Sequence, residues 1–123
     1  MLIGLIAGAM LILTGTGAVW GTAAAAASSK LGRNGWAGIR IGSTGTSDAA
    51  WLAGHQAALP TASATGIASL ILGMAMIIDG VITRDDEGSI LFWILFILGY
   101  GGVLIATITM AIQASRAARA TAE

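Results

Sequence analysis

"TGIASLILGMAMIIDG", residues 65–80, has no lysine or arginine, and its glycines recur every seven residues at Gly66, Gly73 and Gly80. The apolar run around it covers residues 59–82, which is long enough for a helix to cross the roughly 30 Å hydrocarbon layer of a bilayer. Lipid tails are as apolar as leucine, so membrane helices associate through small residues that let their backbones approach closely. The stretch therefore predicts a membrane-spanning helix whose glycine seam packs against another helix.

The rest of the chain is similarly apolar. Of its 123 residues, 56% are hydrophobic and only 10% are charged, whereas a soluble domain carries about 25% charged residues. Two further runs without lysine or arginine, residues 1–27 and 90–112, are also long enough to span. Residues 1–27 lack the positively charged start of a signal peptide, so we interpret them as a span. We expect an all-α, integral membrane three-helix bundle that forms a single domain, residues 1–123.

Small residues also recur at helical spacing in the other two spans. Gly99 and Gly102 share a face of the third span, and one stripe of the first span contains Gly4, Gly8, Gly15, Ala18 and Thr22. Residues three, four or seven positions apart lie on the same side of a helix. These stripes therefore predict where the helices of the bundle touch.

Basic residues gather on one side of the expected membrane. Five of the six lie in the connection 28–58 or in the C-terminal tail, at Lys30, Arg33, Arg40, Arg116 and Arg119. Three spans place these two regions on the same side, and the positive-inside rule makes that side cytoplasmic. We therefore predict a multi-pass protein of the plasma membrane, with its N-terminus outside and its C-terminus in the cytoplasm.

Composition also excludes several classes of function. Six basic residues balance six acidic ones, and there is no basic stripe to follow phosphates, so we expect no nucleic-acid partner. The chain has no cysteine and one histidine, which argues against a metal site, and we expect no cofactor. No nucleophile, base and orienting group can be assembled from these residues, so we do not expect an enzyme.

The connection contains the most distinctive stretch, "RNGWAGIRIGSTGTSDAAWLAGH", residues 33–55. Thr46 or Ser47 can cap a helix here, and Asp48 then lies in its first turn, where its charge meets the positive helix end. Asp48, Trp51 and His55 fall on one helical face. We predict a short helix at the cytoplasmic interface, either separate from the second span or continuous with it.

Further candidates for binding lie upstream, at Trp36, Gly38, Ile39 and Arg40. We interpret the tryptophans of this stretch as interfacial anchors rather than stacking platforms. Arg40 can hold a lipid phosphate, a helix C-terminus or a carboxylate such as Asp48. We interpret His55 as a hydrogen-bonding group that fixes the stretch against the loop, and we expect Arg40, Trp51 and His55 to form one packed cluster.

Asp79 is the one acidic residue inside an expected span. It lies near the end of that span, so we interpret it as a helix-end carboxylate that reaches water or pairs with Arg84. The alternative is a role in a proton or ion pathway, because an intramembrane acid is often functional.

Residues 33–55 resemble the motif of the SdpI-type family of small bacterial membrane proteins. Gly38, Ile39 and Arg40 match the first part of that motif. The second part is matched in type and spacing by Thr46, Ser47, Trp51 and His55. The hydrophobic hairpin that follows agrees with the family's layout. The resemblance implies immunity to a secreted peptide toxin, combined with membrane capture of a transcriptional repressor.

We therefore expect a non-enzymatic membrane binding protein. It would act in toxin resistance or signalling, or as an accessory subunit of a larger membrane complex. Its expected partners are membrane lipids and either other membrane subunits or a peptide or regulator. The alternative is a small transporter or channel element, which would use Asp79 and the threonines of the third span.

Single cysteines can test the predicted topology because the natural chain contains none. We expect Ser43→Cys to react with a membrane-impermeant maleimide only after the cytoplasmic side is opened, and Ser89→Cys to react in intact cells. Labelling of both positions from the outside would contradict the orientation and the number of spans together.

Overall fold

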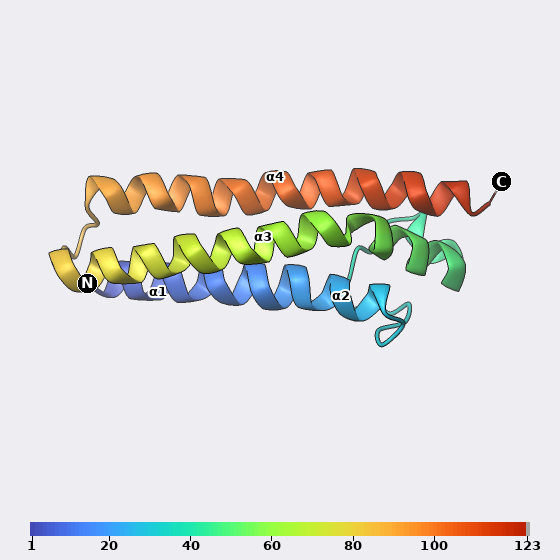
Figure 1. The fold of residues 1–123 in the computed structure, drawn as a ribbon, viewed down its shortest axis with the longest axis horizontal. Coiled ribbons are helices and arrows are strands. Elements are labelled where there is room, and N and C mark those ends of the chain that lie inside the picture. The colour runs from blue at the N-terminus through green and yellow to red at the C-terminus, as the bar shows by residue number, and fades with distance from the viewer. Residues whose placement is uncertain (123) are drawn as a thin grey trace.

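The computed structural model describes residues 1–122, and every regular element within them is helical. Three long rods lie alongside one another (Figure 1). The first rod, called here the first helix, covers Leu2–Ala27 and joins three segments, α1 (Leu2–Ile12), η1 (Leu13–Gly21) and α2 (Thr22–Ala27). The other rods are α3 (Asp48–Thr83) and α4 (Ile90–Ala120). All three are long and apolar enough to cross a membrane, so the structure agrees with the predicted three-helix membrane bundle.

The bundle has two chemically different ends. At one end, called the turn end, the N-terminus meets the connection between α3 and α4 (Figure 1), and the Met1 ammonium lies 3.1 Å from Asp86 Oδ1. At the other end, called the loop end, α4 ends near the connection 28–47. The Ser43 and Ser115 hydroxyls, 3.2 Å apart, join that connection to α4.

The helix predicted near residue 48 is not separate from the second span. Ser47 caps it by accepting the Ala50 N–H at 3.0 Å, and α3 then continues without a break to Thr83. Pro60 lies inside this helix and cannot donate to the carbonyl four residues before it. Figure 1 shows the first part of α3 inclined to the rest, as expected where a proline removes a helical hydrogen bond. Likewise, α4 continues beyond residue 112 into the tail.

The glycine seam of α3 holds the first helix by direct backbone contact. A Cβ at Gly73 would lie 2.7 Å from the Gly8 carbonyl oxygen, and one at Gly80 would lie 3.2 Å from Gly4 Cα. Gly66 lies beneath the ring of Trp20, whose Cε3 would be 2.6 Å from a Cβ. A methyl group at any of these positions would crowd the first helix, so all three glycines predicted to pack do so.

The predicted stripe of the first helix is correct only as far as Gly15. The segment η1, which contains Gly15, is π-helical, so each of its hydrogen bonds spans one more residue than in an α-helix and the register shifts after it. Ala18 is consequently exposed and Thr22 only half-buried. The interior positions are instead Ala23 and Ala26, one residue later in the helical pattern. An α-helical stripe could not anticipate this shift.

Of the two glycines predicted to pack on α4, only one does so. Gly99 lies against Leu11, where a Cβ would meet the leucine Cδ2 at 2.5 Å. The prediction for Gly102 was wrong, because this residue is exposed and a Cβ there would meet nothing within 4 Å. Two residues three positions apart point in somewhat different directions from the helix axis. The contact with the first helix therefore includes only one of these glycines.

Paired alanine substitutions test the seam. Gly73→Ala should lower the free energy of unfolding by about 1–3 kcal/mol, because its methyl group would overlap the Gly8 carbonyl. Gly102→Ala should be neutral or slightly stabilising, since glycine is a poor helix former and the added methyl group meets open space. Denaturation in mixed micelles, followed by circular dichroism, measures both. Equal effects would mean that the seam does not determine stability.

Candidate binding site at the loop end

The connection after α2 is organised by one asparagine. Asn34 Oδ1 accepts the backbone N–H groups of Trp36 and Ala37 at 2.7 and 2.8 Å, and its Nδ2 donates to the Gly32 carbonyl at 2.8 Å. These bonds fold residues 32–37 into a compact turn, which is what asparagine side chains commonly do. The turn displays Trp36 to the surroundings, where 93% of the residue is exposed.

Trp51, on the first part of α3, packs against the connection. Its Nε1 donates to the Leu31 carbonyl at 2.9 Å, and the residue is only 4% exposed. Gly38 passes directly over it with a φ of +99°, and a Cβ there would lie 2.8 Å from Trp51 Cη2. Both the backbone angle and the close approach therefore require glycine at position 38.

His55 lies one helical turn after Trp51 and is fully buried. Its Nε2 accepts the Ile39 N–H at 2.8 Å, and its Nδ1 lies 2.7 Å from the Trp51 carbonyl oxygen. A nitrogen that accepts an N–H carries no proton, and the other nitrogen must carry one to donate to a carbonyl. His55 is thus a neutral imidazole with both nitrogens in use, as expected for a group that fixes the loop.

Thr44 holds the same loop through hydrogen bonds to the backbone of residues 39–41. It is fully buried, and its hydroxyl donates to the Ile39 carbonyl at 2.6 Å. Thr44 Oγ1 also lies 3.3 Å from the Ile41 nitrogen, whose N–H it accepts. Ile39 therefore has its N–H held by His55 and its carbonyl held by Thr44, so the backbone on either side of it has little freedom.

The charged residues of the stretch are arranged differently from the sequence-based expectation. Asp48 pairs with Arg33, whose Nε lies 2.8 Å from Oδ1, and not with Arg40. Trp51 and His55 do form a cluster, with ring centroids 4.3 Å apart. Arg40, expected as its third member, is exposed, and within residues 1–122 its side chain makes no ion pair or hydrogen bond. The cluster therefore consists of Trp51, His55 and the backbone of residues 38–39, with Arg40 outside it.

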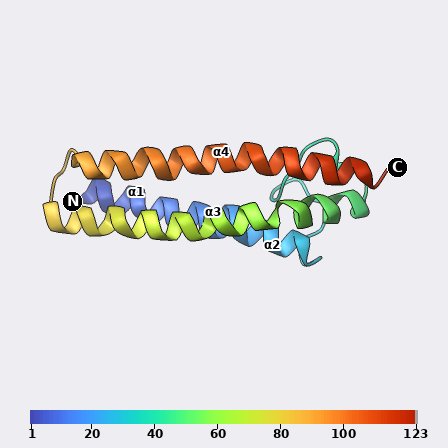
Figure 2. The same cartoon turned by 45° about the horizontal axis from the view of Figure 1, so that its top comes forward.

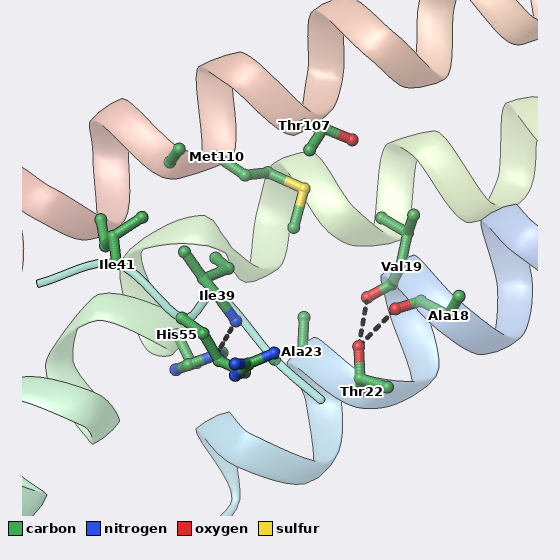
Figure 3. A pocket seen from close by; sticks show the side chains of 12 residues that line it. Ala18, Val19, Thr22, Ala23, Ile39, Ile41, His55, Thr107 and Met110 are labelled. Carbon is green, nitrogen blue, oxygen red and sulfur yellow. Dashed lines mark hydrogen bonds between the residues drawn. The ribbon is translucent and has the colours of Figure 1, made fainter. Parts of the chain in front are cut away.

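A cavity of about 250 Å³ lies beside this cluster. Figure 3 shows Thr107 and Met110 of α4 on one side and Ala18, Val19, Thr22 and Ala23 of the first helix on the other. Ile39, Ile41 and His55 close a third side, and Arg40 also contributes to the lining. The walls are mostly apolar, which suits a hydrophobic group rather than a polar metabolite.

The polar atoms around the cavity offer little chemistry. The Thr22 hydroxyl donates to the Ala18 carbonyl of its own helix, and the Thr107 hydroxyl donates to Val103 in the same way. Within residues 1–122 no three His, Cys, Asp or Glu side chains lie close enough to hold a metal ion. The cavity can therefore bind and orient a ligand, with the Arg40 guanidinium as its charged group.

Asp79 lies at the turn end, far from this site. Its Oδ2 accepts the Ser89 hydroxyl at 2.7 Å, and Ser89 in turn caps α4 by accepting the Phe92 N–H. The expected ion pair with Arg84 is not formed within the described residues 1–122. Asp79 thus joins the end of α3 to the start of α4, which agrees with a helix-end carboxylate.

Two residues that organise the site were not singled out from the sequence. Asn34 stands before Gly35, and Asn-Gly is a common turn signal, so its place in a turn could have been predicted. Thr44 could not have been found in this way. Several serines and threonines are its neighbours, and nothing in the local sequence indicates which of them is buried.

The chain was compared with known proteins. The family model described as the SdpI/YfhL protein family matches residues 30–112, well over half of the chain. This region contains most of the connection, all of α3 and most of α4, whereas the first helix precedes it. Comparisons with curated proteins and with solved structures gave no match.

The role assigned to His55 can be tested by amide hydrogen exchange. His55→Leu should leave the Ile39 N–H without an acceptor, at a cost of about 1–3 kcal/mol, and should speed exchange in residues 38–41. Ala57→Leu, on a nearby exposed position of α3, is the matched control and should leave this exchange unchanged. Equal protection in the two variants would show that His55 does not hold the loop.

Proposed function

The chain belongs to the SdpI/YfhL protein family, and from this premise we propose that it is a non-enzymatic membrane protein that protects its cell from a peptide toxin. Protection would come from binding at the loop end, which we place in the cytoplasm on the charge distribution given above. The partner would be the toxin itself or a regulator that signals its presence.

One observation carries this proposal. The loop holds its backbone rigidly through buried groups, and it displays two exposed side chains, Trp36 and Arg40. Tryptophan and arginine are the residue types most enriched at binding hot spots. A rigid loop also loses little conformational entropy when it binds. The combination supports recognition of a partner.

The buried polar groups support a binding role over catalysis. Both nitrogens of His55 are engaged by backbone groups, so they are not free to take or give a proton to a substrate. The Thr44 hydroxyl is similarly engaged and fully buried. These groups stabilise the loop, and they offer no nucleophile with an adjacent base.

Two other functions are less well supported. An accessory subunit of a larger membrane complex would also display an apolar surface, but lipid alone accounts for that surface. A transporter or channel element would need a polar path through the bundle. Asp79 is bonded to Ser89 at the turn end, so it supports a structural interpretation instead.

Growth of a strain lacking the chain tests the proposal. The strain is exposed to concentrated secretions of its own species and complemented with wild type, Trp36→Ala or Arg40→Ala. Wild type should restore tolerance, and each variant should lower the tolerated dose about tenfold, as expected for loss of a hot-spot contact worth about 1.4 kcal/mol or more.

Arg84→Ala, an exposed arginine at the turn end, is the matched control and should protect like wild type at equal expression. If the deletion strain is as tolerant as its parent, the immunity function is wrong. Recovery of the chain in a large stoichiometric assembly from mild detergent would then favour an accessory subunit.

A further inference from the structure

We propose that the cavity at the loop end binds one anionic phospholipid, whose phosphate contacts Arg40 and whose acyl chain enters between the first helix and α4. This inference concerns a second ligand, and it shares only Arg40 with the toxin-binding proposal. It depends on the shape of the gap, its depth in the bilayer and its charge.

The shape arises because the first helix crosses α3. Near the turn end it touches α4, where Leu11 meets Gly99 and the Tyr100 hydroxyl donates to the Ala7 carbonyl. Towards the loop end it diverges. In the view of Figure 2, α1 lies on the side of α3 nearer α4, whereas α2 lies on the far side. The cavity occupies the opening that this divergence leaves, and exposed Ala18 and Thr107 lie on its two sides.

The depth matches the headgroup boundary. At about 1.5 Å per residue, Ala111, which also lines the cavity, lies about 30 Å along α4 from Ile90, and Ala23 lies about 30 Å along the first helix from Leu2. The hydrocarbon layer of a bilayer is also about 30 Å thick. If the helices enter the hydrocarbon at the turn end, the cavity therefore lies where the opposite headgroups begin, with its apolar walls towards the acyl chains.

The charge favours an anionic ligand. Five of the six basic residues belong to the loop end, and the carboxylate of Asp48 is already paired with Arg33. Arg40 lines the cavity without an ion pair among residues 1–122. A guanidinium presents a planar set of donors that matches two phosphate oxygens at once. A lipid with net negative charge is thus preferred over a zwitterionic one.

The size of the cavity suits one acyl chain rather than a whole lipid molecule. Its volume of about 250 Å³ lies below the range of roughly 300–1,000 Å³ typical of complete drug-sized ligands. Part of one acyl chain fits, while the remainder of the lipid stays in the bilayer. A folded peptide does not fit this space, so the occupant is a membrane lipid.

Native mass spectrometry of the delipidated full chain tests this site. Phosphatidylglycerol and phosphatidylcholine with identical acyl chains are titrated separately. We expect phosphatidylglycerol to bind about tenfold more tightly, as a charge-assisted contact would give. Arg40→Gln should remove this preference. Because Arg40 is exposed, the variant should fold normally, and circular dichroism checks this.

A second pair of variants tests the acyl-chain part of the site. Ala18→Phe should fill the cavity and weaken both lipids about tenfold. Ala9→Phe, on an exposed position of the same helix outside the cavity, is the matched control and should bind like wild type. Millimolar inorganic phosphate should not displace phosphatidylglycerol, since it lacks the acyl chain.

Three outcomes would overturn the proposal. The first is equal affinity of the wild type for the two lipids. The second is equal affinity of the Ala18→Phe and Ala9→Phe variants. The third is displacement by inorganic phosphate, which would mean that a free anion is the ligand. None of these measurements involves the toxin, so the two proposals fail independently.

Discussion

Direct backbone contact between the first helix and α3 is the constraint on which the rest of the structure depends. In a bilayer the burial of leucine or isoleucine gains nothing, so the position of a helix is set by where its backbone can approach another. Gly8 and Gly73 provide that approach in the half of the bundle nearer the turn end, and Gly4 and Gly80 repeat it at the turn end itself. This seam fixes the crossing of the two helices, and the crossing determines how far the first helix lies from α4.

The π-helical segment η1 determines which side chains of the first helix line the cavity. Because it shifts the register, Ala23 rather than Thr22 enters the interior and packs with Ala58, Ala62 and Met110. Ala18 and Thr22 are thereby left at the cavity instead of against α3. Segments of π-helix frequently occur at functional sites, and here the physical reason is visible, since the shift exposes small side chains beside a loop that presents Arg40.

The sequence predicted the fold because the signals for it are compositional. Apolar runs without lysine or arginine predicted all three helices, and glycine spacing in α3 predicted its packed face. Periodicity could not identify the packed face of a helix that is apolar all round, because positions facing lipid and positions facing protein carry the same residue types. Gly102 was misassigned for this reason. It also could not reveal the π-helical shift, and it left open whether α3 continues through Pro60. At the site, helical spacing predicted the pairing of Trp51 and His55, whereas the bonds of Thr44 depend on tertiary contacts that no local pattern encodes.

The residues of the motif divide into those that build the loop and those that it displays. Gly38, Trp51 and His55 are engaged with one another and with backbone groups, so substitution there acts first through folding. Arg40 and Trp36 are exposed and support nothing in the described chain, so their chemistry is available to other molecules. A motif residue that is buried and fully hydrogen-bonded, such as His55, would therefore mislead a search for function. The displayed arginine is the better guide, because an unpaired guanidinium at the headgroup boundary attracts an anionic partner.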